Sequence, residues 1–433
     1  MIRWIDRMVP HMLFCLTTLL VLFGLVMVYS SSAFRDYRRD SQKKWEEAVE
    51  LAVVRATERP GHSGASDPNE SIDTLREQDA IRRASMLNTF LKQIVWVLLG
   101  FVALAFAASV DYPLWGKRIG WLMLLVLGLQ AALFIIPANT GLPVQSRLIN
   151  GSRSWLEILK FRLQPSETAK IGLILFSSWY LARRVQKGSL TLVSTLPALP
   201  VLALSVGLIL CESDKGVAVH LCLSLLLLWL LAAGGLAQVL LLGGLSTAAI
   251  GAVVATSEEA RSRIIHYFTE DSFQMLHAKE AFSRGGFLGK GLGDGDAALS
   301  AYLFGAHNDF IFAVVGEELG FITTSLLVAG YLALVLLGLK VAAGCTDPFG
   351  TFLALGITIL IGAQAFLNMA IVTGLAPTTG FTLPLVSYGG SSLTWTMIAM
   401  GILINISMST HNHLLRGVNR VKPEPFGGGR MVL

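Results

Sequence analysis

The chain has 433 residues, of which 53% are hydrophobic and 15% are charged, and its formal net charge is +5. Soluble proteins carry roughly 25% charged residues because their surfaces face water, so the soluble, disordered and fibrous classes are excluded. Lysine and arginine are spread over the loops, which argues against nucleic acid as a partner. The composition predicts an integral membrane protein with many spans.

The apolar stretches predict an all-α polytopic fold. A helix needs about 20 apolar residues to cross the hydrocarbon core of a bilayer. We expect the 433 residues to form a single membrane domain, with long segments at 33–89 and 257–308. Ten transmembrane helices are predicted, at residues 12–32, 90–110, 119–137, 166–182, 192–211, 216–233, 236–256, 309–338, 350–374 and 388–409.

The distribution of positive charge predicts the orientation. An even number of spans places both chain ends on one side, and the short connections and tails on that side carry twelve lysines and arginines. The 138–163 connection on the other side carries four. Because positive charge in short loops favours the cytoplasm, both termini, including the tail at 411–433, are predicted to be cytoplasmic. The unusual segments, rich in polar residues, glycine and proline, then lie on the outer face.

Two outer segments are long. Segment 33–89 is predicted to form a helical hairpin around the turn-forming stretch RPGHSGASDPNE, either as a docking element or as a solvated spacer. Segment 257–308 separates the seventh and eighth spans and is predicted to border the active site at the outer face.

Asp309 is the leading candidate for chemistry. It stands at the start of the eighth span, within GAHNDFIFAVVGEELG. Charged groups in membrane spans are costly and therefore mark functional candidates. A carboxylate at a water-accessible mouth could act as a general base. The alternative is that Asn308 or Asp309 caps the helix.

Other charged residues leave two interpretations each. Glu167 and Lys170 can pair on one helix face, either to anchor the span or to contact substrate. The charged residues of ESDKG, at 212–216, either line a cavity or form a polar turn. The glycine-rich stretch GGFLGKGLGDG around Lys290 could bind a phosphate through its backbone N–H groups, or it is a flexible turn.

Buried amides and outer histidines complete the candidates. Gln364 and Asn368 are four residues apart in the ninth span, and we expect them to form hydrogen bonds between helices. The spacing of His266, His277 and His307 matches no metal site, so no metal ligands are predicted.

Seven motifs resemble the SEDS family, which comprises the FtsW, RodA and SpoVE proteins. They are LKQIVWVLLG at 91–100, NGSRSW at 150–155, LQPSETAK at 163–170, ESDKG at 212–216, GGFLGKGLG at 285–293, AHNDFIFAVVGEELG at 306–320 and TTGFTLPLVSYGGSSL at 378–393. The last of these is more similar to FtsW than to RodA, which implies a role in cell division.

The resemblance implies a peptidoglycan glycosyltransferase of the bacterial cytoplasmic (inner) membrane, with ten spans and both ends cytoplasmic. Its substrate would be lipid II, and its partners a class B penicillin-binding protein transpeptidase and other divisome proteins. The family motif AH-x-DF places the catalytic aspartate on Asp309. A divalent cation could assist, although no carboxylate cluster predicts one. We expect substrate contacts at Arg153, Glu167, Lys170, Asp214, Lys290, His307 and Ser387.

The chain departs from the family pattern at four positions. Ser154 replaces an arginine, Ser213 replaces a proline, and Phe304 and Gly305 replace a Pro-Glu pair. These differences put substrate contacts before Asp309 in question. Two other functions stay open: a lipid II flippase, which needs a polar path to the inner face, and a non-catalytic scaffold that activates the transpeptidase.

Overall fold

The computed structural model describes most of the predicted membrane domain. The described residues are 2–33, 90–138, 144–149, 152–158, 161–188, 191–212, 214–233, 236–256, 258, 261–262, 265, 273–295 and 307–420. The predicted hairpin at 33–89 lies outside them, apart from its first residue. The last turns of α16 extend into the predicted tail, of which residues 421–433 also lie outside.

Each of the ten predicted spans coincides with a helical segment, which confirms the polytopic fold. They are α1 (Ile2–Ala33), the helix Phe90–Ser109, α5 (Ile119–Ile135), α6 (Pro165–Gln186), α7 (Leu192–Thr195) with η1 (Leu196–Ala198) and α8 (Leu199–Cys211), α9 (Lys215–Ala233), α10 (Leu236–Thr256), α14 (Ile311–Gly344), α15 (Pro348–Val372) and α16 (Gly390–Arg420). Within the described residues, seven helices are long and apolar enough to cross a membrane.

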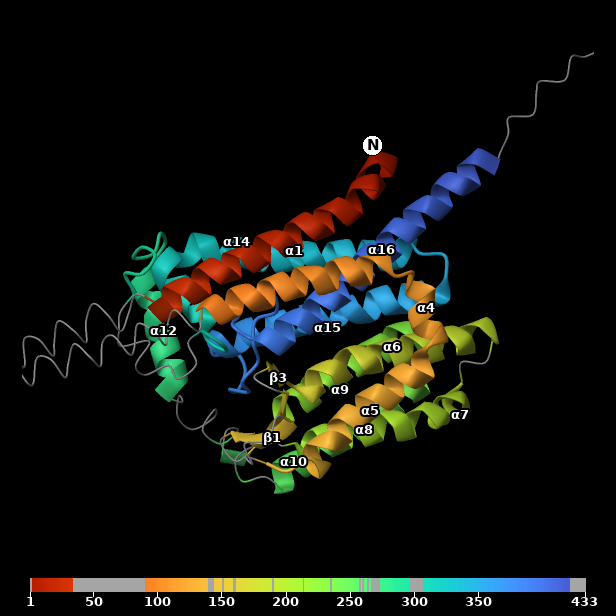
Figure 1. The fold of residues 1–433 in the computed structure, drawn as a ribbon, viewed down its shortest axis with the longest axis horizontal. Coiled ribbons are helices and arrows are strands. Elements are labelled where there is room, and N and C mark those ends of the chain that lie inside the picture. The colour runs from red at the N-terminus through yellow and green to blue at the C-terminus, as the bar shows by residue number, and fades with distance from the viewer. Residues whose placement is uncertain are drawn as a thin grey trace, which may run out of the picture.

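The helices lie side by side along the long axis of the molecule (Figure 1). The start of α1 and the end of α16 lie toward the same end as α4 (Tyr112–Lys117) and α7, which we call the termini end. The opposite end, which we call the sheet end, carries α12 (Phe273–Gly285) and the strands.

Helix α15 is the centre of the bundle. It packs against α6, α9, α14 and α16. Small residues allow this close packing, because a β-carbon added at Gly356 would clash with Ile174 of α6 and one added at Gly338 of α14 would clash with Thr358. The central position of α15 means that a polar residue on it can reach several other elements.

Part of the 138–163 connection is a three-stranded antiparallel sheet, which the all-α prediction did not include. Its strands are β1 (Val144–Ile149), β2 (Ser152–Ile158) and β3 (Phe161–Leu163), in the order β1-β2-β3. In the register, Gln145 pairs with Glu157 and Leu156 with Leu163. The signal in the sequence is the Asn-Gly dipeptide at 150–151 between two short runs, which is typical of a hairpin.

The eighth predicted span is not one continuous helix, because α14 is interrupted at Gly320. This residue has φ +74° and ψ −174°, outside the helical region. The backbone groups freed by the break bond to the glycine-rich turn after α12. The N–H groups of Lys290 and Gly291 donate to the carbonyls of Glu317 and Glu318, at 3.0 and 2.9 Å. The span proper therefore begins at Phe321, and residues 311–319 form a separate buried helical segment.

Candidate active site

Asp309 lies in the turn that precedes α14, and its side chain is half-buried. Its carboxylate lies beside Gly380: a β-carbon added at this glycine would be 3.5 Å from Asp309 Oδ2. The N-cap of α14 is Phe310, whose own side chain makes no capping hydrogen bond. The carboxylate therefore lies next to the 375–389 loop at Gly380.

The backbone around Asp309 is held by buried side chains. Asn368 of α15 donates from Nδ2 to the carbonyl of Asp309 at 2.8 Å and to the carbonyl of Phe381 at 2.5 Å. Ser387 donates from Oγ to the carbonyl of Asn308 at 2.6 Å. The turn before α14 and the 375–389 loop are thus joined into one unit.

Two further spanning-helix side chains bind the same loop. Gln364 donates from Nε2 to the carbonyl of Thr382 at 3.0 Å, and Tyr331 of α14 donates its hydroxyl hydrogen to the carbonyl of Pro384. Non-helical backbone inside a membrane protein needs such partners, because water is not available to bond it.

Glu167 and Lys170 form the predicted ion pair. Lys170 Nζ lies 2.8 Å from Glu167 Oε2, and both side chains are less than a tenth exposed. Lys170 also donates to Gln364 Oε1 at 2.9 Å, so the predicted cross-helix bond of Gln364 is present.

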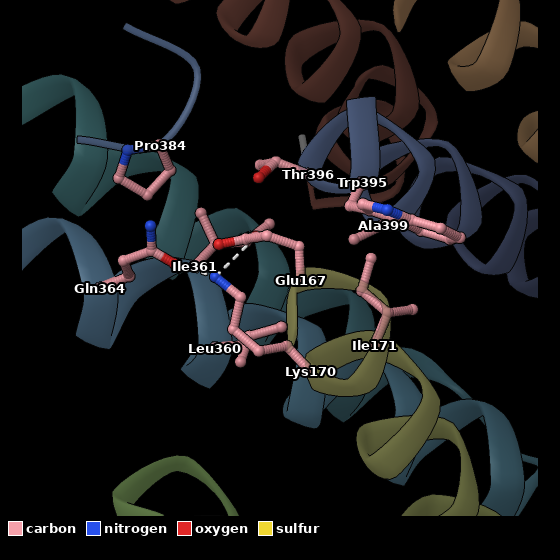
Figure 2. Close-up of a pocket in the computed structure, with 10 residues that line it drawn as sticks. All are labelled: Glu167, Lys170, Ile171, Leu360, Ile361, Gln364, Pro384, Trp395, Thr396 and Ala399. Carbon is pink, nitrogen blue, oxygen red and sulfur yellow. Dashed lines mark hydrogen bonds and ion pairs between the residues drawn. The ribbon is translucent and has the colours of Figure 1, made fainter. Parts of the chain in front are cut away.

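A small cavity, lined by both polar and apolar side chains, lies beside this pair. Its volume is about 10 Å³, enough for about one water molecule. Figure 2 shows Glu167, Lys170 and Gln364 gathered on one side of it and Trp395 and Thr396 of α16 on the other.

Asp214 and Glu212 lie in the turn between α8 and α9. Asp214 Oδ2 accepts hydrogen bonds from Gln164 Nε2 at 2.7 Å and from Ser166 Oγ at 3.0 Å, which joins this turn to the start of α6. Burial raises the pKa of Asp214. Burial, with a smaller contribution from the charge of Asp214, raises the pKa of Glu212 to about 8. The side chain of Glu212 is fully buried, and its backbone carbonyl accepts a hydrogen bond from Ser154 Oγ at 2.9 Å.

Lys290 lies in the turn that fills the break in α14. Its Nζ is 3.6 Å from Glu317 Oε1, and about a third of its side chain is exposed. The backbone N–H groups of Lys290 and Gly291 already bond to α14. They are therefore not available to bind a phosphate in this conformation.

The remaining predicted contacts differ in their surroundings. Arg153 donates to Ser146 Oγ at 2.9 Å and to the carbonyl of Ile136, so its side chain is held at the sheet. The ring of His307 packs edge-on against Tyr388, at 5.5 Å between centroids, and burial lowers its pKa.

The structure brings Asp309, His307 and Ser387 together through the 375–389 loop, and Glu167 and Lys170 reach the same loop through Gln364. Sequence reasoning did not foresee that Gln364 and Asn368 would bind the loop. Their spacing on one helix face was the signal. Of the four departures from the family pattern, Ser213, Phe304 and Gly305 lie outside the described residues.

Comparison with known proteins identifies the family. The FtsW/RodA/SpoVE family model, described as cell cycle protein, matches residues 72–412. A probable peptidoglycan glycosyltransferase FtsW from Geobacter sulfurreducens is 37% identical over 325 residues, which cover 73% of this chain and 85% of that protein. Stage V sporulation protein E from Bacillus subtilis is 30% identical over 406 residues, which cover 92% and 97%.

Solved structures share the fold. RodA of Thermus thermophilus, as its D255A mutant, superposes with a TM-score of 0.59 at 21% identity, covering 92% of this chain and 96% of that one. A chain of a peptidoglycan synthase complex that coordinates polymerization and crosslinking gives a TM-score of 0.61 at 21% identity, covering 86% and 98%. The chain is therefore a multi-pass membrane protein that belongs to the FtsW/RodA/SpoVE family.

Proposed function

We propose that this protein is a peptidoglycan glycosyltransferase that polymerises lipid II at the outer face of the cytoplasmic membrane, with Asp309 as its general base. Relatives at 37% and 38% identity that are named probable peptidoglycan glycosyltransferases support the reaction. The observation that carries the role of Asp309 is its setting. Its half-buried carboxylate lies against Gly380, between two backbone segments that buried side chains hold in register.

The reaction is a single displacement. Asp309 accepts the proton of the attacking sugar hydroxyl, whose oxygen bonds to the anomeric carbon of the second sugar while the bond from that carbon to the lipid diphosphate breaks. The configuration at the anomeric carbon is inverted. Negative charge develops on the departing diphosphate, and a cation nearby stabilises it. Lys290 suits this role better than Lys170, which is enclosed between Glu167 and Gln364.

We place both termini in the cytoplasm and a class B penicillin-binding protein beside the chain. The basic residues Lys117, Arg183 and Arg184 lie at helix ends of the termini end, in agreement with the positive-inside rule. The peptidoglycan synthase complex that contains the structural relative couples polymerization to crosslinking, which supports a transpeptidase partner.

The test is polymerisation of labelled lipid II by the purified protein with its cognate transpeptidase. Asp309→Asn removes the base and should abolish the polymer, with the complex intact. Asp347→Asn is the matched control, because Asp347 caps α15 at the termini end through Gly350 N, and asparagine caps equally well.

Each other result contradicts a defined part of the proposal. Normal polymer from Asp309→Asn excludes Asp309 as the base. Lipid transfer across the bilayer without polymer indicates a flippase. A complex that does neither, yet stimulates its partner, indicates a scaffold.

A further inference from the structure

We propose that Asn368 is a positioning residue for Asp309: its side-chain amide fixes the distance between the backbone of Asp309 and the loop segment against which the Asp309 carboxylate lies. The proposal rests on Asp309 being the base.

One amide group makes both contacts. Asn368 Nδ2 donates to the carbonyl of Asp309 at 2.8 Å and to the carbonyl of Phe381 at 2.5 Å. An asparagine Nδ2 carries two hydrogens, so these two bonds use all of its donors. Gly380, beside the Asp309 carboxylate, immediately precedes Phe381. The two segments that flank the carboxylate are therefore held by a single NH2 group.

The amide has one possible orientation. If it were turned over, its oxygen would face two carbonyl oxygens, and neither could donate a hydrogen. The side chain is 1% exposed, so water cannot replace a lost bond cheaply. Among the described residues, Asn368 Oδ1 has no hydrogen-bond partner. The hydrogen bonds of the Asn368 side chain are therefore the two that its NH2 group donates.

Gln364 extends this arrangement by one helical turn. It lies four residues before Asn368 on α15 and donates to the carbonyl of Thr382, the residue after Phe381. Its own oxygen accepts from Lys170, which Glu167 holds in place. The buried ion pair therefore fixes the direction in which the Gln364 amide points, and α15 presents consecutive donors to consecutive loop carbonyls.

A positioning role differs from a purely structural one in what it does to catalysis. Misplacement of a catalytic group by about 1 Å can lower a rate on the order of 100-fold, without any loss of substrate binding. Asn405 of α16 offers a matched structural comparison. It is also buried, donates to the carbonyl of Ala108 at 2.8 Å and accepts from Tyr112 N at 2.9 Å, at the termini end.

The experiment measures kcat and KM for lipid II polymerisation by the full chain with its transpeptidase, together with the thermal unfolding midpoint. Asn368→Leu removes both donors and keeps a side chain that branches at the same carbon. Asn405→Leu makes the same change in size at the other end, where it removes one donated and one accepted hydrogen bond. We expect Asn368→Leu to lower kcat by about 10- to 100-fold, with KM changed by less than about twofold. Asn405→Leu should lower the unfolding midpoint by about as much as Asn368→Leu does and leave kcat unchanged.

Asn368→Ser provides a second variant if Asn368→Leu does not fold, because its hydroxyl keeps one donor. It should lower kcat by less than Asn368→Leu and by more than Asn405→Leu. An unchanged kcat in the Asn368 variants, or an equal loss of kcat in Asn405→Leu, overturns the inference. Asp309→Asn is assayed in parallel. If it is inactive, an unchanged kcat in the Asn368 variants rejects only the role of Asn368. If it is active, Asp309 is not the base and the proposed function is rejected before the role of Asn368 is considered.

Discussion

The two ends of the helix bundle connect their helices in different ways. At the termini end, α14 passes to α15 through residues 345–347, and the groups of this turn bond to one another. Asp347 accepts from Gly350 N at 3.1 Å, and Thr351 donates its hydroxyl hydrogen to the carbonyls of Cys345 and Asp347, each at 3.1 Å. These hydrogen bonds lie within the connection, and Tyr112 of α4 also bonds to Cys345 and Asp347.

At the sheet end, the connecting segments bond to side chains of the spanning helices. Carbonyls of the 375–389 loop accept from Gln364, Asn368 and Tyr331, which lie on α15 and α14. Glu318 beside the Gly320 break accepts from Ser30 of α1 at 2.6 Å. The candidate site therefore depends on polar residues inside the bundle. Substitutions of these residues should disturb the structure of the sheet end far more than that of the termini end.

The largest expected effect comes from Lys170→Met. It leaves Glu167 buried without its cation, which costs about 3–5 kcal/mol in comparable buried pairs, and it frees the amide of Gln364. Lys187→Met, at the exposed end of the same helix, should change stability by less than about 0.5 kcal/mol. Thermal unfolding in detergent measures both, and equal midpoints would contradict the comparison.

A smaller effect is expected from Gly320→Ala. At φ +74° a side chain is strained, and the new β-carbon would contact the backbone of Phe287 and Gly289. We expect a cost of about 1–3 kcal/mol. Gly330→Ala in the same helix meets its nearest neighbours, Leu16 and Leu20, at 3.9 Å and should be neutral or stabilising. A stable Gly320→Ala variant would mean that the helix break carries no strain.

For a change of one pH unit, the smallest effect is the dependence of stability on the protonation of Glu212. Its pKa is raised to about 8 from an ordinary value of 4.5, so between these values the folded chain keeps a proton that the unfolded chain loses. Stability should therefore fall by about 1.4 kcal/mol per pH unit as pH rises through this window. Glu212→Gln should flatten the curve of unfolding midpoint against pH. A slope that persists in the variant would assign it to another group.

Several features of the structure could be predicted from short stretches of the sequence. Hydropathy predicted the membrane helices because each needs only its own apolar residues, and seven helices of the described residues are long and apolar enough to cross a membrane. The spacing of Glu167 and Lys170 predicted their pair because residues three apart share a helix face. The helix break at Gly320 was not predicted, because a glycine within an apolar run is also compatible with a continuous helix. The turn that fills the break lies about 30 residues earlier in the chain.

The sequence by itself determined where the membrane helices lie. It also identified Asp309 as a candidate catalytic residue and predicted that Gln364 and Asn368 form hydrogen bonds between helices. The tertiary structure alone decided which groups those amides meet. Asn368 and Asp309 are 59 residues apart, and their contact depends on how α15 packs between α6 and α14. A hydrogen bond requires partners at about 3 Å with the right orientation, and helix packing, which no local pattern encodes, sets that distance.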